Sequence, residues 1–378
     1  MKFIFLIAAF NAFFFAILLF QKKPRELHDY ILILWLLYLG LFIGVYSFYS
    51  HELFIHFKLL SISFTSLFLL HGVFLFFYIL ALVSSKKIFD KINLIHFAPF
   101  VLFNCYLLAI SFFPNISEMI RLDYAQVNIS PPLLFIFFLI ATILSGPFYF
   151  VLSIRLFKKL DLDIFNNFSS SEEIDLIWLR KLVYIFGIIW TALIIITVIH
   201  HVFNLFSMAF CTDGLFLSLS VFVILIGYFG LKQKIIFSGD TINEQVIVEE
   251  TKVKYASSRL TEAEANQFAD KLNNFMVSEK PFLNPNLTLQ QLGSELKIST
   301  HYLSQIINEK FNLNFFDYIN QFRVEEFKLK ISDPQFENYS FLGIAFDCGF
   351  NSKSAFNRIF KKFTNLTPSQ YKAAVTKH

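Results

Sequence analysis

Seven long apolar stretches follow one another along the first 231 residues, separated by polar loops. They lie at 3–20, 30–49, 61–83, 93–113, 132–154, 182–203 and 214–231. Each has about the ~20 residues that a helix needs to cross the hydrocarbon of a bilayer, and none carries Asp or Glu in its middle. We expect the first stretch to be a span and not a cleavable signal peptide, because its strong positive charges follow the apolar residues. The pattern predicts a seven-helix transmembrane domain over 1–231.

The pattern changes to that of amphipathic helices in the last third of the chain. Residues 232–260 are mixed and polar, and we interpret them as a linker. From Thr261 onwards apolar residues recur at helical spacing, and Thr261 followed by Glu264 predicts a capping box at the first helix. The expected organisation is therefore a membrane domain (1–231), a linker (232–260) and a soluble domain (261–378).

The soluble domain contains two copies of one pattern. Leu292-Gly293 in the first copy corresponds to Ile344-Ala345 in the second, and such tandem similarity rarely arises by chance. In each copy a small residue lets two helices cross closely, and the chain turns four positions later. Ser299 and Ser352 then stand where they can cap the next helix. Each copy has the pattern of a helix-turn-helix unit, whose second helix can enter a major groove.

With these residues in view, the domain resembles the DNA-binding domain of the AraC/XylS family of bacterial transcription regulators. The second copy, over 343–363 and 366–372, carries the strongest resemblance, and 289–313 is similar to the family's other helix-turn-helix. Residues 315–331 resemble the long helix that joins the two. Together with the seven apolar stretches, the resemblance predicts an all-α fold for the chain: a seven-transmembrane-helix bundle plus a domain of two helix-turn-helix subdomains joined by a long helix. It also implies binding to double-stranded DNA.

The resemblance implies that exposed residues on the second helix of each copy read base edges. These residues are His301, Ser304 and Gln305 in the first copy and Lys353, Ser354, Asn357 and Arg358 in the second. Arg can bond guanine bidentately, and Asn or Gln can do the same with adenine. Lys361 and Lys362 lie further along, where contact with the DNA backbone is expected. His301 could equally be an ordinary solvent-facing residue.

The first copy departs from the family pattern at several positions. Lys297 stands where the turn glycine is usual, whereas the second copy has Gly349 there. Gln305 and Asn308 replace the basic residues that are common on that recognition helix. Phe327 replaces the usual alanine of the joining helix, which indicates altered packing. The fold is expected to persist, but tight base contact is expected mainly from the second copy.

The distribution of charge predicts the topology and supports DNA binding. Lys and Arg concentrate in the loops after stretches one, three, five and seven, and basic loops stay in the cytoplasm. This places the N-terminus outside and residues 232–378 inside, in a bacterial cytoplasmic (inner) membrane. After Asp347 no acidic residue follows, while Lys353, Arg358, Lys361 and Lys362 do. Affinity that rests on such phosphate contacts falls with salt.

The composition favours a membrane protein and gives no sign of an enzyme. Hydrophobic residues make up 56% of the chain and charged residues 16%, against ~25% in soluble domains. The three cysteines form no CxxC pair. His200 and His201 are adjacent and cannot share a helix face as metal ligands, although His71 could meet either one across the bundle. We interpret these histidines as polar packing, and expect no catalytic residue, metal or cofactor.

These patterns favour a one-component sensor and regulator. A signal from outside or within the membrane would change the disposition or dimerisation of the cytoplasmic domain. The expected partners are double-stranded DNA, the lipid bilayer, an unknown signal ligand and a second copy in a homodimer. Two alternatives remain open. One is a transporter or membrane enzyme with a feedback DNA-binding domain, which would need an ionisable path through the bundle. The other is a membrane-anchored regulator released by proteolysis in the linker.

Overall fold

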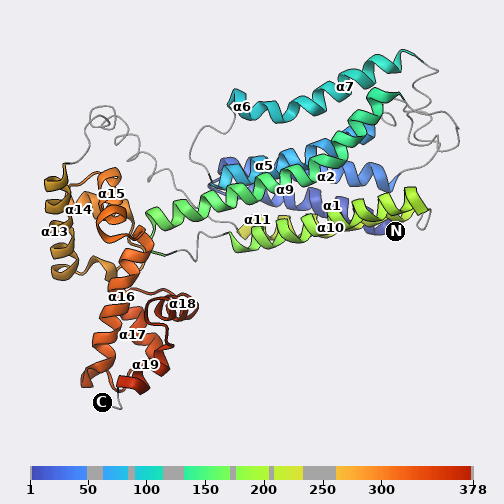
Figure 1. Ribbon diagram of the computed structural model, residues 1–378. Helices are drawn as coiled ribbons and strands as arrows, with labels where there is room; N and C mark the ends of the chain where they lie inside the picture. The colour runs from blue at the N-terminus through green and yellow to red at the C-terminus, as the bar shows by residue number, and fades with distance from the viewer. Residues whose placement is uncertain are drawn as a thin grey trace. The chain divides into compact units, whose positions relative to one another are not determined.

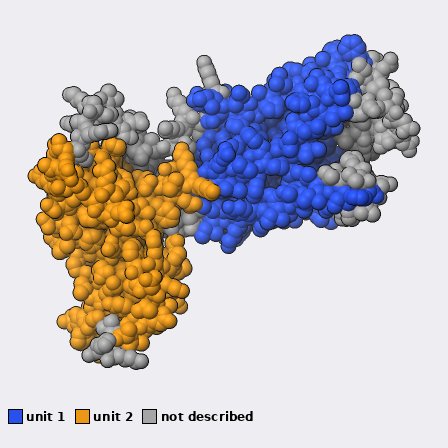
Figure 2. Space-filling model, in the orientation of Figure 1, with its two compact units in different colours: residues 1–157, 176–238 blue, residues 158–175, 239–378 orange. Residues whose placement is uncertain are grey.

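The structure, a computed structural model, describes residues 2–48, 63–83, 90–113, 132–170, 176–203, 208–232 and 261–375. The chain divides into two compact units (Figure 2). Unit 1 contains residues 1–157 and 176–238, and unit 2 contains residues 158–175 and 239–378. The predicted all-α fold is confirmed, since every regular element within the described ranges is a helix (Figure 1). Most of the predicted linker, 233–260, lies outside the described residues.

Unit 1 consists of long apolar helices. Its elements are α1 (Lys2–Gln21), α2 (Leu27–Ser47), η1 (Phe64–Leu67), α5 (Phe68–Val83), α6 (Lys91–Leu94), η2 (Ile95–Phe97), α7 (Ala98–Ser111), α9 (Leu133–Asn167), α10 (Ile177–Phe203) and α11 (Met208–Lys232). Within the described ranges, seven segments are long and apolar enough, by length and composition, to cross a membrane. Each overlaps one of the seven predicted stretches. The last turns of α9 belong to unit 2.

Close helix contacts in unit 1 depend on small residues. Helix α1 packs against α2 and α11, and its buried positions include Ala8, Ala12 and Ala16, spaced by four. Small side chains at this spacing let the backbones of neighbouring helices approach closely.

Helix α9 extends well beyond its predicted end. The apolar stretch ends near residue 154, but the helix continues to Asn167 through a segment rich in charged residues. The expectation of a loop there was wrong, because the end of hydrophobicity marks the end of a span and not the end of a helix. The continuation keeps helical spacing of apolar residues, with Leu160 and Ile164 buried.

Unit 2 contains the duplicated pattern as two helix pairs. Its elements are α13 (Glu262–Ser278), η4 (Pro281–Leu283), α14 (Leu289–Leu296), α15 (Thr300–Phe311), α16 (Phe315–Ser332), η5 (Pro334–Phe336), α17 (Phe341–Asp347), α18 (Lys353–Thr364) and α19 (Pro368–Val375). The pair α14–α15 forms the first helix-turn-helix and α17–α18 the second, while α16 joins them (Figure 1).

The predicted caps are present in unit 2. The Thr261 hydroxyl accepts from the Glu264 amide, and the Glu264 carboxylate accepts from the Thr261 amide at 2.9 Å. The Ser299 hydroxyl accepts from the Tyr302 amide, and the Ser352 hydroxyl accepts from the Ala355 amide. Each bond satisfies a backbone donor that the first helical turn leaves unpaired.

The two turns use different residues for the same left-handed conformation. Gly349 has a φ of +91°, as the sequence predicts, while Lys297 adopts a φ of +56° at the C-terminal cap of α14. A side chain in this region is strained, so the first turn is maintained at a cost that glycine avoids in the second.

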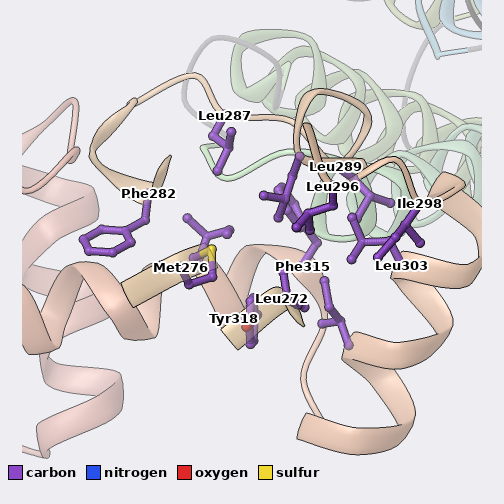
Figure 3. Close-up of a cluster of buried hydrophobic side chains, with 13 residues drawn as sticks. Leu272, Met276, Phe282, Leu287, Leu289, Leu296, Ile298, Leu303, Phe315 and Tyr318 are labelled. Carbon is purple, nitrogen blue, oxygen red and sulfur yellow. The ribbon is translucent and has the colours of Figure 1, made fainter. Parts of the chain in front are cut away.

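Helix α16 contributes to two separate hydrophobic cores. Phe315, Tyr318 and Ile319 join the first core with residues of α13, α14 and α15 (Figure 3). Phe316, Val324 and Phe327 join the second core with residues of α17 and α18. Because both cores include one rigid helix, α16 fixes the relative placement of the two helix-turn-helix subdomains.

Candidate nucleic-acid interface

Helix α18 presents a basic face to solvent. The expected base-reading residues Lys353, Ser354, Asn357 and Arg358 are exposed, as are Lys361 and Lys362. The opposite face buries Ala355, Phe356, Ile359 and Phe360 in the second core. The apolar positions therefore fix the orientation of the helix, and the cations are left on the surface.

A groove brings most of these side chains together. It has a volume of about 740 Å³, and Lys353, Asn357, Arg358 and Lys361 line it. Residues 367–369, where α19 begins, form another part of its wall. The groove thus combines three cations with one amide side chain, a set that suits phosphate oxygens and base edges.

Lys362 differs from the other cations of α18. Its Nζ lies 2.6 Å from the Asp317 carboxylate of α16. A nucleic-acid phosphate would have to compete with this carboxylate, so Lys362 is the weaker of the two expected backbone contacts.

Helix α15 presents a face with little net charge. His301 is exposed, and Ser304 and Gln305 are half-buried. Gln305 donates to the Glu309 carboxylate at 3.0 Å, and Asn308 donates to the Ser304 carbonyl at 2.8 Å. These amides bond within the helix, so base contact would have to displace those bonds. The contrast with α18 agrees with the expectation of weaker contact by the first copy, although contact by any of these residues stays a prediction.

Sequence reasoning missed a polar junction centred on Arg323 of α16. This side chain is 1% exposed, and all three of its nitrogens donate hydrogen bonds. Nε donates to the Phe282 carbonyl at 2.7 Å, and the terminal nitrogens donate to the Asn284 carbonyl at 2.7 Å and the Ser169 carbonyl at 3.0 Å. Burial lowers the pKa of the guanidinium, and these acceptors replace the water that it loses.

The junction includes the residues that follow α9. Ser169 is 1% exposed, and its carbonyl also accepts from the side-chain amide of Asn320 at 3.1 Å. The Ser169 amide donates to the Leu287 carbonyl at 3.1 Å. Nearby, the Phe165 ring lies edge-on to Phe316 at 5.3 Å. Residues 165–169 are therefore built into unit 2, at the helix that joins its two subdomains.

Residues of the second subdomain also contact this junction. Asn351 donates to the Ser170 hydroxyl at 2.7 Å. A side chain at Gly349 would collide with the carbonyl of Phe282, which accepts from Arg323. Position 349 therefore requires glycine for two reasons: its φ is positive, and the backbone of the first subdomain approaches it closely. We call residues 165–170 with Arg323, Asn320 and Asn351 the Ser169 junction.

Unit 2 also contains one cysteine, Cys348. Cys348 is buried, and burial raises the pKa of its thiol to about 12, which disfavours the reactive thiolate. Within the described part of the chain, no group of three or more His, Cys, Asp or Glu side chains could hold a metal ion.

Two helix-turn-helix units on one joining helix, the second with a basic exposed face, define a double helix-turn-helix domain. Comparison with known proteins agrees: residues 292–374 match a family described as "Helix-turn-helix domain". The C-terminal part of the chain therefore contains a helix-turn-helix domain, in agreement with its resemblance to AraC-type regulators.

The relatives share this domain and little else of their length. An uncharacterised HTH-type transcriptional regulator of Staphylococcus aureus is 31% identical over 103 residues, which cover 27% of this chain and 13% of the relative. The melibiose operon regulatory protein of Escherichia coli is 29% identical over 86 residues, covering 23% and 28%. Among solved structures, the C-terminal domain of the response regulator yesN from Fusobacterium nucleatum is 29% identical. It covers 28% of this chain and 98% of that chain, with a TM-score of 0.23.

Proposed function

We propose that this protein is a membrane-anchored, sequence-specific DNA-binding transcription regulator. In this proposal the seven-helix unit senses a signal from outside the cell or from within the membrane. Helix α18 reads the bases in a major groove through Lys353, Asn357 and Arg358, and Lys361 contacts the DNA backbone. The domain match, the named regulators that share it and the basic groove support the DNA-binding part.

The exposed surface of unit 1 supports the membrane part. Large apolar side chains face outward on its helices, among them Phe3 at 82%, Leu133 at 85% and Ile188 at 68% exposed. Exposed apolar area on this scale suits lipid and not water. Together with the seven candidate spans, it favours a multi-pass protein of the bacterial cytoplasmic membrane.

The observation that carries the proposal is the course of α9. Its first part is apolar and long enough to cross a membrane, and its last turns pack inside the DNA-binding unit. Two residues after the helix ends, Ser169 bonds to the buried Arg323 of α16. A shift of α9 would therefore reach the helix that sets the spacing of the two recognition helices. Two positions of α9 that the signal favours unequally would suffice for regulation.

Topology reporters test this proposal directly. With residues 158–175 and the DNA-binding domain in the cytoplasm, a reporter that is active only outside it should be silent when fused near Lys87 or Phe168. The same reporter should be active near Asn115 or Ser207, because basic loops mark the cytoplasmic side. The inverted pattern would separate the DNA-binding domain from DNA and would remove the proposed function.

A further inference from the structure

Unit 1 contains a partly open cavity among α2, α5, α9, α10 and α11. It has a volume of about 90 Å³, and the surface of its wall is almost wholly apolar. None of the described residues in this wall is Asp, Glu, Lys or Arg. Ser145, one of the few polar residues, donates to the Thr142 carbonyl at 2.7 Å. The Tyr149 hydroxyl lies 3.1 Å from Nδ1 of His96. The cavity is therefore suited to an uncharged, apolar occupant.

The wall of the cavity is more exposed on one side than on the other. On α2 and α11 the lining residues are buried, with Leu39 at 0% and Phe222 at 5% exposed. On α5, α9 and α10 most of them are half-buried, as at Gly146, Gly187 and Trp190. The cavity thus opens on the side of α5, α9 and α10, and its inner end lies against α2 and α11.

Two glycines fix the rings that form part of this wall. A Cβ at Gly72 of α5 would collide with the ring of Tyr149 on α9. A Cβ at Gly146 of α9 would likewise collide with the ring of Trp190 on α10. Each ring therefore occupies a place that glycine leaves free, and α9 contacts both of its neighbours through such a pair.

In a bilayer crossed by these helices, the cavity lies near the centre of the hydrocarbon. Its wall includes Leu39, Gly72, Gly187 and Phe222, each close to the middle of a candidate span. These spans are Leu27–Ser47, Phe64–Val83, Ile177–Ile196 and Thr212–Lys232. The hydrocarbon core is about 30 Å thick, and the acyl chains of the two leaflets end at its centre. The opening of the cavity is therefore next to the ends of lipid chains and far from the headgroups.

We propose that this cavity binds the end of one acyl chain of a membrane phospholipid. The chain enters from the side of α5, α9 and α10, and its terminal carbons contact Leu39 and Phe222. A cavity of about 150 Å³ in an engineered protein holds benzene, so this smaller one suits the narrow end of a chain better than a ring. Occupation restores van der Waals contacts that the walls of an empty void lack. The inference rests on the membrane part of the proposed function and adds a lipid ligand that lies against α9.

Photo-cross-linking of the full-length protein in lipid nanodiscs tests the proposal without DNA. The probe is a phosphatidylglycerol with a diazirine at the end of one acyl chain, and mass spectrometry identifies the labelled residues. It should label Trp35 and Leu39, which line the cavity and are 2% and 0% exposed. It should not label Leu36 or Ile43, which are 0% exposed on the same helix and lie outside the cavity wall. The same lipid with its diazirine beside the ester group should label none of the four residues.

Matched variants separate this site from lipid at the surface of the protein. Val183→Phe adds a ring to the cavity wall and should abolish labelling of Leu39, while Ile188, which is 68% exposed, stays labelled. Val221→Phe makes the same substitution at a 50% exposed position of α11 and should preserve the labelling of Leu39. Leu75→Phe, at another position of the wall, serves if Val183→Phe fails to fold.

Three results would overturn the proposal. They are no labelling of Trp35 and Leu39, equal labelling of Leu36 and Ile43, and labelling of Leu39 that survives a cavity-filling variant. Labelling of Leu39 by a free hexane that carries a diazirine, but not by the lipid, would assign the cavity to a small free hydrocarbon and would also overturn it. None of these results bears on topology or DNA binding, whereas inverted reporters would remove the proposed function and leave the labelling unchanged.

Discussion

At the scale of single residues, the basic face of α18 contains two kinds of cation. Arg358 and Lys361 line the groove, and the described residues place no carboxylate within ion-pair distance of either. Lys362 is held by Asp317 at 2.6 Å. Arg358 presents the planar fork that recognises guanine, while Lys361 presents a point charge. The two side chains should therefore contribute differently to sequence preference.

We expect Arg358→Ala to lose about 1–3 kcal/mol of specific binding and to relax preference at one base pair, as the loss of a bidentate contact does. Lys361→Ala should weaken binding to all sequences alike and reduce the salt slope by about one phosphate contact. The measurement is titration of the full-length protein in nanodiscs with duplexes selected from a random pool and with scrambled duplexes. An unchanged specificity ratio for Arg358→Ala would show that the reading face lies elsewhere.

At the scale of elements, α16 determines whether the two subdomains act as one body. Phe327 is 0% exposed, and its ring centroid lies 4.6 Å from that of Phe356 and 5.3 Å from that of Phe360. The bulky residue that departs from the family pattern therefore fills the second core and attaches it to the joining helix.

Phe327→Ala should destabilise the second subdomain by about 3–5 kcal/mol, the usual cost of emptying a buried phenylalanine site. Leu329→Ala, two residues further on α16 and 68% exposed, should have little effect. Hydrogen exchange of the full-length protein can measure both, because loss of the second core should speed exchange in α17 and α18 more than in α14 and α15. Uniform acceleration in both pairs would contradict a separate second core.

Local features of these elements were predictable from the sequence, and distant ones were not. The caps at Ser299 and Ser352 and the turn at Gly349 depend on residues within a few positions, so spacing predicts them. The left-handed conformation of Lys297 could be expected only from its correspondence with Gly349, because lysine itself disfavours that conformation. The Ser169 junction was not predictable either, since its partners lie about 150 to 180 positions apart and such contacts leave no periodicity in the chain. The sequence did contain one indication of this junction. Arg323 places a charged side chain among the apolar positions of α16 that contribute to the two hydrophobic cores.

At the scale of the whole molecule, the proposed function requires a regulator that acts while it remains in the membrane. If this is so, full-length protein should stay in the membrane fraction while its target genes respond, and no soluble fragment should appear. Immunoblots of fractionated cells, with tags at both ends of the chain, measure this together with the transcripts. A soluble C-terminal fragment beginning within 233–260 that appears with the response would favour release by proteolysis.

The Ser169 junction makes such a release harder than the linker alone suggests. A cut within 233–260 breaks one covalent connection, but residues 261–378 would still hold residues 165–170 by the bonds to Arg323, Asn320 and Asn351. In the intact chain the two partners are tethered, and this high effective concentration favours the docked state. After a cut the same contacts must survive as an ordinary bimolecular complex, and its lifetime would set the delay between cleavage and escape. The junction would then act as a timer on any protease that attacks the linker.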